Sequence, residues 1–203
     1  MISKQKVRQP HKIGMLIVLS APSGTGKTTL VNKLKQICPD IVVSVSYTTR
    51  KPRGSEKQGI DYYFIDEKDF KEKIKKNFFA EWAKVYDNYY GTSKKFIEEN
   101  LNKQKIILLT IDTQGALQIK SKYPDAVLIG IMPPSLEEQK KRLEKRGETE
   151  QNIKRRLKES SLERKILLTK YNYCFINRDI EKTLKRIISA IKKEYKNIYC
   201  EKP

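Results

Sequence analysis

The chain has 203 residues, of which 33% are charged and 38% hydrophobic, and 43 Lys/Arg against 24 Asp/Glu give a formal net charge of +19. This length suits one compact domain, and no apolar run approaches the ~20 residues needed to span a bilayer, so no membrane-spanning helix is expected. The charge favours an anionic partner but does not distinguish a nucleotide from a nucleic acid or a membrane surface.

The single histidine, His11, makes a His-based catalytic triad an improbable choice. Cys38, Cys174 and Cys200 lie far apart and form no C-x-x-C motif, so the sequence predicts neither a zinc site nor a disulfide. A reducing, cytoplasmic compartment fits this pattern. The basic N-terminus before Met15 imitates a signal peptide, but cleavage after the apolar run would cut into a glycine-rich loop.

Short apolar runs alternate with amphipathic stretches along most of the chain. The expected strands are 15–20, 41–45, 106–111, 126–132 and 173–176. Helical spacing occurs at 28–37, 114–122, 135–146 and 180–195. This alternation predicts an α/β fold, with a P-loop NTPase-like parallel sheet covered by helices on both faces.

Two stretches interrupt the alternation and predict appendages to the sheet. Residues 46–93 are rich in Tyr, Thr, Gly and Arg, include a strand-like run at 61–65, and predict a small mixed α/β lobe. Residues 136–170 are strongly charged and predict a helical lid. The expected organisation is a flexible extension at 1–12 and a domain at 13–203, whose core comprises 13–45, 94–135 and 171–203.

A glycine-rich loop follows the first expected strand and matches G-x-x-x-x-G-K-[ST], except that Ala stands first. Its glycines let backbone N–H groups turn toward phosphates, and the following helix adds its positive end. Lys27 is expected to bridge the β- and γ-phosphates of ATP, and the Thr28 hydroxyl to reach Mg²⁺. The predicted ATP-binding residues here are Ala21, Pro22, Ser23, Gly24, Thr25, Gly26, Lys27, Thr28 and Thr29.

A basic segment at 46–54 follows the second expected strand. Arg50 and Arg53, fixed by the proline between them, can form a fork around one phosphate, because guanidinium groups are planar and bidentate. The hydroxyls of Ser46 and Tyr62 could complete this shell. By itself the segment is equally consistent with a solvated basic turn.

This segment, read with 59–64, resembles the GMP-binding region of guanylate kinases. The resemblance runs through nearly the whole chain, with further motifs at 79–83 (FAEWA), 88–92 (NYYGT), 111–115 (IDTQG), 133–135 (PPS) and 142–147 (RLEKRG). It implies transfer of the γ-phosphoryl group of MgATP to GMP, and to dGMP, with no specific nucleic acid or membrane partner. A monomer and a homodimer both remain open.

The resemblance also assigns roles to side chains. The GMP phosphate is assigned to Ser46, Arg50, Arg53, Tyr62 and Tyr90, and guanine to Glu81, Thr92 and Asp112. The implied catalytic residues are Lys27, Arg50, Arg142, Arg146 and Arg156, and Asn177 is placed near adenine. Chemistry supports Glu81, because a carboxylate can accept hydrogen bonds from both guanine N1–H and the 2-amino group, which adenine cannot offer.

Three features depart from the family pattern. Thr110 stands where an aspartate is usual, Arg178 replaces an acid, and the lid is one residue shorter, so the Arg156 assignment depends on a gap placed before Ile153. Three alternatives stay open: a peptide-binding scaffold domain that has lost catalysis, a nucleic-acid binder that uses the net charge, and a kinase for another nucleoside monophosphate.

Overall fold

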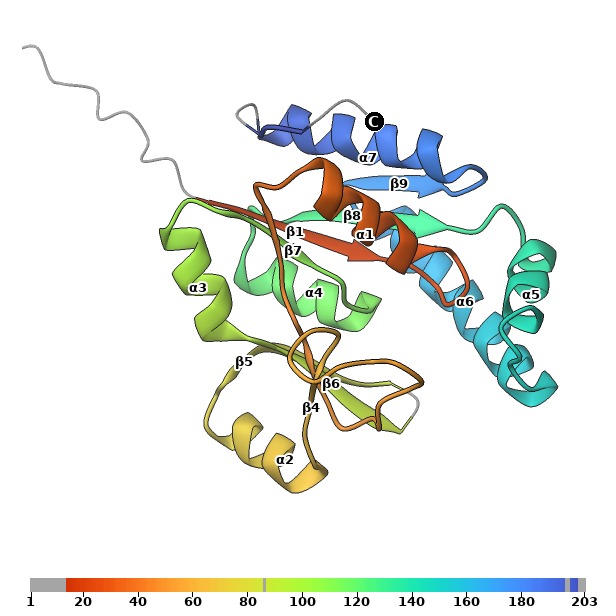
Figure 1. Ribbon diagram of the computed structural model, residues 1–203, viewed down its shortest axis with the longest axis horizontal. Coiled ribbons are helices and arrows are strands. Elements are labelled where there is room, and N and C mark those ends of the chain that lie inside the picture. The colour runs from red at the N-terminus through yellow and green to blue at the C-terminus, as the bar shows by residue number, and fades with distance from the viewer. Residues whose placement is uncertain (1–13, 86, 196–197, 201–203) are drawn as a thin grey trace, which may run out of the picture.

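The structure is a computed structural model that describes residues 14–85, 87–195 and 198–200. A five-stranded sheet forms its centre, in the order β2-β7-β1-β8-β9, and all neighbouring strands are parallel (Figure 1). The strands are β1 (Met15–Ser20), β2 (Ile41–Val43), β7 (Ile106–Leu109), β8 (Val127–Met132) and β9 (Tyr173–Ile176). The expected α/β fold with a parallel sheet is therefore confirmed.

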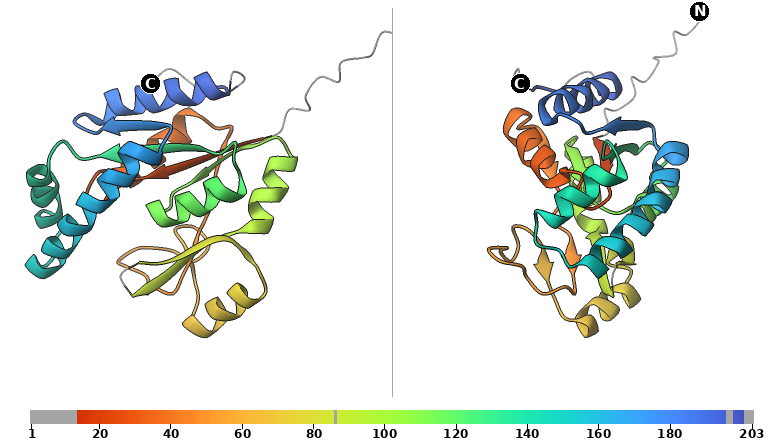
Figure 2. Two further views of the ribbon diagram at one scale, coloured as in Figure 1. Left: turned by 180° about the vertical axis from the view of Figure 1, so that it is seen from behind. Right: turned by 90° about the vertical axis from the view of Figure 1, so that its right-hand side faces the viewer.

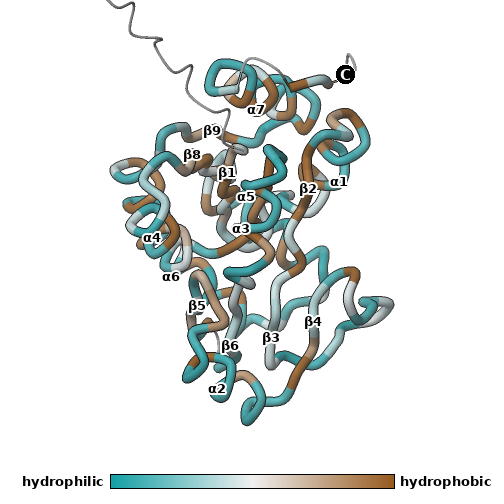
Figure 3. The backbone as a smooth tube through the Cα atoms, turned by 90° about the vertical axis from the view of Figure 1, so that its left-hand side faces the viewer, coloured by the Kyte–Doolittle hydropathy of each residue, from teal (hydrophilic) through white to brown (hydrophobic). Residues whose placement is uncertain are grey.

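Helices cover both faces of this sheet (Figure 2). One apolar cluster joins alternate residues of β1 to α1 (Lys27–Ile37) and α7 (Ile180–Glu194), and the other joins the remaining residues of β1 to α3 (Lys94–Asn102) and α4 (Thr113–Lys122). Because successive side chains of a strand point to opposite faces, the continuous apolar run of β1 contributes to both clusters. In Figure 3, β2 is mainly hydrophobic, whereas α5 is mainly hydrophilic.

A second sheet, of order β4-β3-β6-β5, lies beside the first (Figure 1). Its strands are β3 (Tyr47–Thr48), β4 (Tyr63–Phe64), β5 (Phe79–Val85) and β6 (Asn88–Ser93). The strand-like run at 61–65 is thus shorter than expected. Helix α2 (Glu67–Lys75) closes this part through the buried Phe70, whose ring stacks on Phe79 with centroids 4.5 Å apart.

Two helices follow β8 before the chain returns to the sheet, α5 (Leu136–Glu144) and α6 (Glu150–Lys170). They are separated at Gly147, whose φ of +74° is one that glycine adopts freely. Among the described residues, none of the helices combines the length and the apolar character needed to cross a bilayer. The predicted extension at 1–12, with His11, lies outside the described residues.

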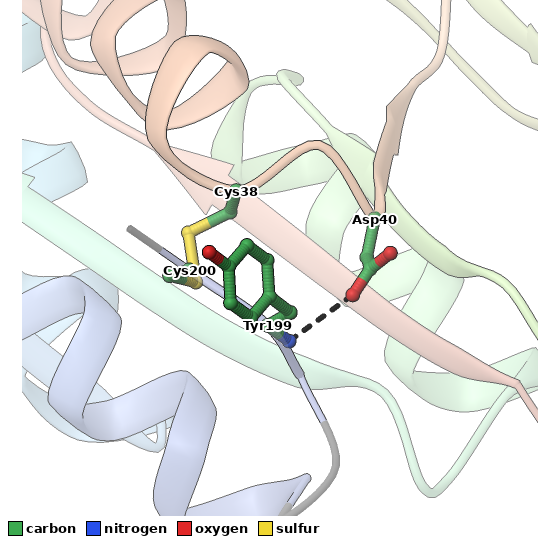
Figure 4. Close-up of a disulfide and its surroundings, with 4 residues drawn as sticks. All are labelled: Cys38, Asp40, Tyr199 and Cys200. Atoms are coloured by element: carbon green, nitrogen blue, oxygen red, sulfur yellow. Dashed lines mark hydrogen bonds between the residues drawn. A yellow bond between two sulfur atoms is a disulfide. The ribbon is translucent and has the colours of Figure 1, made fainter. Parts of the chain in front are cut away.

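The expectation of no disulfide is wrong, because Cys38 and Cys200 form one (Figure 4). Cys38 is the C-cap of α1, and the segment after α7 returns across this helix end, where the Tyr199 N–H also donates to Asp40 Oδ2 at 3.1 Å. The two cysteines are 162 residues apart in sequence, and only the packing of α7 beside α1 brings them together. Sequence spacing alone could not reveal this pair.

Candidate active site

The phosphate loop connects β1 to α1 at the carboxyl edge of the larger sheet. Gly24 and Gly26 have φ of +82° and +93°, in the left-handed region that glycine adopts without a steric penalty. Gly26 is the N-cap of α1, and within the described chain no side chain caps this helix start. The N–H groups of its first turn therefore remain available to an anion, beside the exposed Thr28 and Thr29.

Lys27 lies between two acids from separate elements. Burial lowers the pKa of Lys27, while the charges of Glu163 on α6 and Asp112 before α4 raise it. Burial in turn raises the pKa of Glu163 to about 7, against the attraction of Lys27. The charges of Glu163 and Asp112 thus favour the protonated form of Lys27, which can attract an incoming phosphate.

Two of the three predicted lid arginines reach the phosphate loop. Arg156 donates from Nη1 to Ser23 Oγ at 2.7 Å and also pairs with Glu148 at 3.1 Å. Arg142 Nη1 lies 3.5 Å from the Thr25 carbonyl oxygen. Arg146 lies exposed in the turn after α5 and is not brought against the loop in this conformation.

Asn177 follows β9 and contacts the same loop. Its Nδ2 donates to the Thr25 carbonyl at 2.7 Å, and its Oδ1 is a buried oxygen without a hydrogen-bond partner among the described residues. The side chain therefore lies at the edge of the predicted ATP site, with one polar atom still able to accept from a ligand.

The smaller sheet positions the predicted phosphate-binding residues. Arg50 makes two hydrogen bonds of 2.9 Å to the carboxylate of Glu56, and its guanidinium lies 5.2 Å from the centre of the Tyr62 ring. The Arg53 side chain is exposed, while its backbone N–H donates to Glu56 Oε2 at 2.8 Å. Glu56, to which the sequence analysis gives no role, therefore joins the Arg50 guanidinium to the backbone of Arg53.

Ser46 and Tyr90 belong to neighbouring parts of the smaller sheet, where β3 pairs with β6. Ser46 is buried immediately before β3, and Tyr90 on β6 faces Tyr62 with ring centroids 6.1 Å apart. Burial and the neighbouring Tyr90 raise the pKa of Tyr62, so its hydroxyl stays protonated and can donate to an anion.

The predicted guanine acceptor is deeply buried. Glu81 on β5 is 1% exposed, and its Oε1 accepts from Thr92 Oγ1 at 2.6 Å. Burial raises the pKa of Glu81 to about 7, and the charge of Asp112 adds to this rise. Asp112 caps α4, accepting from the N–H groups of Gln114 and Gly115 at 2.7 and 3.1 Å. The charge of Asp112 thus raises the pKa of both Glu81 and Lys27.

Comparison with known proteins identifies the family. The guanylate kinase family model matches residues 14–194. The chain belongs to the guanylate kinase family. It is 46% identical over 181 residues to the guanylate kinase of Caldanaerobacter subterraneus subsp. tengcongensis (89% of this chain, 87% of the relative) and 47% identical over 182 residues to that of Clostridium tetani (89% and 86%). The crystal structure of guanylate kinase from Anaplasma phagocytophilum superposes with a TM-score of 0.75 at 38% identity, covering 90% and 87% of the two chains.

As a guanylate kinase, the chain is an enzyme of the nucleoside monophosphate kinase class, and the expected family is confirmed. Three residues at the site escaped motif reasoning: Glu56, Glu163 and Gln139. Glu56 stands in the segment that resembles the family but receives no role there, and Glu163 lies in a charged helix, where acids more often form exposed ion pairs. Gln139 lies on a charged helix between the half-buried Glu138 and the exposed Lys140. Only the packing of α5 and α6 shows that it is buried.

Proposed function

We propose that this chain transfers the γ-phosphoryl group of ATP to GMP or dGMP, giving ADP and GDP or dGDP. The proposal rests on the buried hydrogen-bonded pair Glu81–Thr92. The charge of Asp112 acts on Glu81 of this pair and also on Lys27 of the phosphate loop. An ionised Glu81 accepts hydrogen bonds from guanine N1–H and from the 2-amino group. Adenine has an acceptor at N1 and no 2-amino group, so the buried carboxylate would have no donor to bind. Donor and acceptor nucleotides would then meet near Asp112.

In this mechanism an oxygen of the GMP phosphate attacks the γ-phosphorus in line, and ADP leaves. The GMP phosphate is already an anion, so the reaction needs no protein nucleophile and no strong general base. Arg50, held by Glu56, positions the GMP phosphate together with Ser46, Arg53, Tyr62 and Tyr90. Lys27 and the lid arginines, Arg142, Arg146 and Arg156, would stabilise the charge that develops during transfer.

Mg²⁺ would supply neutralisation of the β- and γ-phosphate oxygens. The residues present fit this ion as a partner of ATP: Thr28 offers an exposed hydroxyl at the start of α1, and among the described residues no cluster of three or more Asp, Glu, His or Cys forms a separate metal site. Thr110 removes one carboxylate that the family usually has there, so the metal would depend chiefly on phosphate and water oxygens.

We place the enzyme in the cytoplasm, where its nucleotide substrates are found, with no membrane or specific nucleic-acid partner. Binding of ATP would occupy the loop 21–29 and bring adenine to Asn177, whose unpartnered Oδ1 can accept from the 6-amino group. The site needs one chain only, which suits a monomer as well as a homodimer.

A coupled ADP-release assay with MgATP and each of GMP, AMP, CMP and UMP tests this function. ADP is expected with GMP alone, and Lys27→Ala should abolish it while keeping the thermal unfolding transition. Turnover with AMP at a similar rate would indicate another nucleoside monophosphate kinase. Folded protein that is silent with every acceptor would instead support the scaffold alternative.

A further inference from the structure

The backbone of the phosphate loop is held from its outer side by polar side chains. The Pro22 carbonyl accepts from the N–H and Oγ1 of Thr25 at 3.3 and 2.6 Å, and the Ser23 carbonyl accepts from Gln139 Nε2 at 2.7 Å. The peptides of the described residues are all trans. In a trans peptide the C=O and the N–H point in opposite directions, so a carbonyl held outward turns the next N–H the other way.

Gln139 makes this contact from a fully buried position on α5. It is 0% exposed, and its Oε1 accepts from Ser160 Oγ of α6 at 2.9 Å. Ser160 is itself 2% exposed. A buried amide is costly unless it is hydrogen-bonded, and here both its oxygen and its nitrogen have partners. The amide is thereby fixed in one orientation, with its nitrogen directed at the Ser23 carbonyl.

Helix α5 also packs directly on the loop at the next residue. A Cβ added to Gly24 would lie 3.2 Å from Leu143 Cδ2 and 3.5 Å from the Gln139 carbonyl oxygen. The peptide between Ser23 and Gly24 therefore has its carbonyl bonded to α5 and its N–H directed away from that helix. If this peptide turned over, it would present a carbonyl oxygen to the phosphates, and the two negative groups would repel.

We propose that Gln139, oriented by Ser160, is a positioning residue for ATP: it holds the Ser23 carbonyl outward and so directs the Gly24 N–H at the phosphates. The inference rests on the proposed use of this loop for ATP. Gln139 itself would not contact the substrate. It would act by fixing the orientation of the peptide between Ser23 and Gly24. GMP binding, which is proposed to depend on the smaller sheet and on Asp112, should be independent of it.

The test compares the wild type with Gln139→Met, which keeps the length of the side chain and removes both hydrogen bonds, and with Ser160→Ala. Asn100→Leu is the matched control, because Asn100 Nδ2 donates to the Phe96 carbonyl at 2.8 Å within α3, away from the loop. For each protein we would measure the Kd of MgADP by calorimetry, the KM of ATP and of GMP, and thermal unfolding.

Gln139→Met is expected to weaken MgADP binding and raise the KM of ATP by about 5- to 30-fold, the effect of losing one well-placed hydrogen bond and leaving its partner unpaired. The KM of GMP should stay within about twofold, because the acceptor contacts are unchanged. Ser160→Ala should act in the same direction and more weakly. Asn100→Leu should leave all three constants unchanged, because it lies within α3 and away from the loop.

Unchanged MgADP affinity in folded Gln139→Met, with a lowered unfolding temperature, would show a purely structural role and overturn the proposal. An equal rise in the KM of GMP would overturn it as well. If Gln139→Met does not fold, unchanged MgADP affinity in Ser160→Ala overturns the proposal and weakened affinity supports it. Failure of the wild type to bind MgADP would instead reject the proposed function.

A spectroscopic readout separates positioning from stability. The chain has nine glycines, so selective ¹⁵N-glycine labelling gives few amide signals. The Gly24 signal, assigned through its loss in a Gly24 variant, should shift on addition of MgADP in the wild type and shift less in Gln139→Met. An identical shift in both proteins would contradict the proposal.

Discussion

The Glu81 carboxyl must be ionised to accept two hydrogen bonds from guanine, yet burial raises its pKa to about 7 in the free protein. Below that pH, GMP binding must therefore remove a proton from Glu81. We expect the KM of GMP to rise up to about tenfold for each pH unit below 7 and to level off above pH 8, with the KM of ATP as the internal control. A KM for GMP that is flat from pH 5.5 to 8.5 would contradict this account.

The same raised pKa predicts that Glu81 destabilises the folded protein at neutral and alkaline pH. The folded state keeps this proton up to about pH 7 while the unfolded state loses it near 4.5, so stability falls as the pH rises between these values. Glu81→Gln keeps an acceptor for Thr92 and removes the buried charge. It should raise the free energy of unfolding at pH 8 by about 1–3 kcal/mol and have little effect at pH 4.

Urea denaturation at the two pH values measures this difference, and the coupled assay measures what it costs in function. Glu81→Gln should lose most of the preference for GMP over AMP, because its amide N–H₂ would face the donors of guanine. A variant that is less stable than the wild type at pH 8 would show that the carboxylate contributes hydrogen bonds worth more than its desolvation.

At the level of elements, the first turn of α4 sets the room available to the Glu81 side chain. A Cβ at Gly115 would lie 2.3 Å from Glu81 Oε2, so Gly115→Ala must displace the carboxylate or the helix. We expect the KM of GMP to rise about tenfold or more with the KM of ATP nearly unchanged, measured in the coupled assay. Leu117→Ala, on the exposed side of the same helix, is the control and should change neither constant.

The elements differ in how far sequence could predict them. The strands of the larger sheet were predicted because each is a short run of apolar residues, as in β1 and β8, and the glycine loop marks one strand end. Helices α2 and α3 were not placed individually, because each buries essentially one residue, Phe70 or Ile97, among charged neighbours. Both helices are nevertheless amphipathic, and Asp66 and Ser93 cap their first turns, so the signals that mark them were present in the sequence.

The site was predictable where it is built from local motifs and unpredictable where it depends on packing. The phosphate loop and the basic segment at 46–54 are contiguous, so their residue types reveal their chemistry. Glu163 and Gln139 meet the loop only because α5 and α6 fold back on it. The partner of Arg50 is Glu56, six residues away, and a turn rather than a periodic element sets that distance.

Across the whole molecule, the end of the described chain is tied to the helix that starts at the phosphate loop. Ile198 is buried in the apolar cluster of α1 and α7, and the adjacent segment carries the bond from Cys200 to Cys38. Cys38 is fully buried whereas Cys200 is partly exposed, so a reductant can approach this bond from the Cys200 side. Proteins of a reducing compartment rarely keep disulfides, which makes the redox state of this pair informative about the compartment.

Reduction of this bond should lower stability without altering catalysis. A crosslink across 162 residues restricts the unfolded chain, and its loss typically costs about 2–5 kcal/mol, or roughly 5–15 °C in unfolding temperature for a chain of this size. Cys200→Ser should reproduce the effect of dithiothreitol, whereas Cys174→Ser, at the unbonded cysteine, should not. Both KM values should stay unchanged, because the bond lies at the far end of α1 from the loop. Alkylation of the unreduced, denatured protein followed by mass spectrometry should find one free thiol. Three free thiols in protein alkylated within cell lysate would mean that the pair is reduced in the cell. In that case α7 and Ile198 would hold the terminal segment by packing alone.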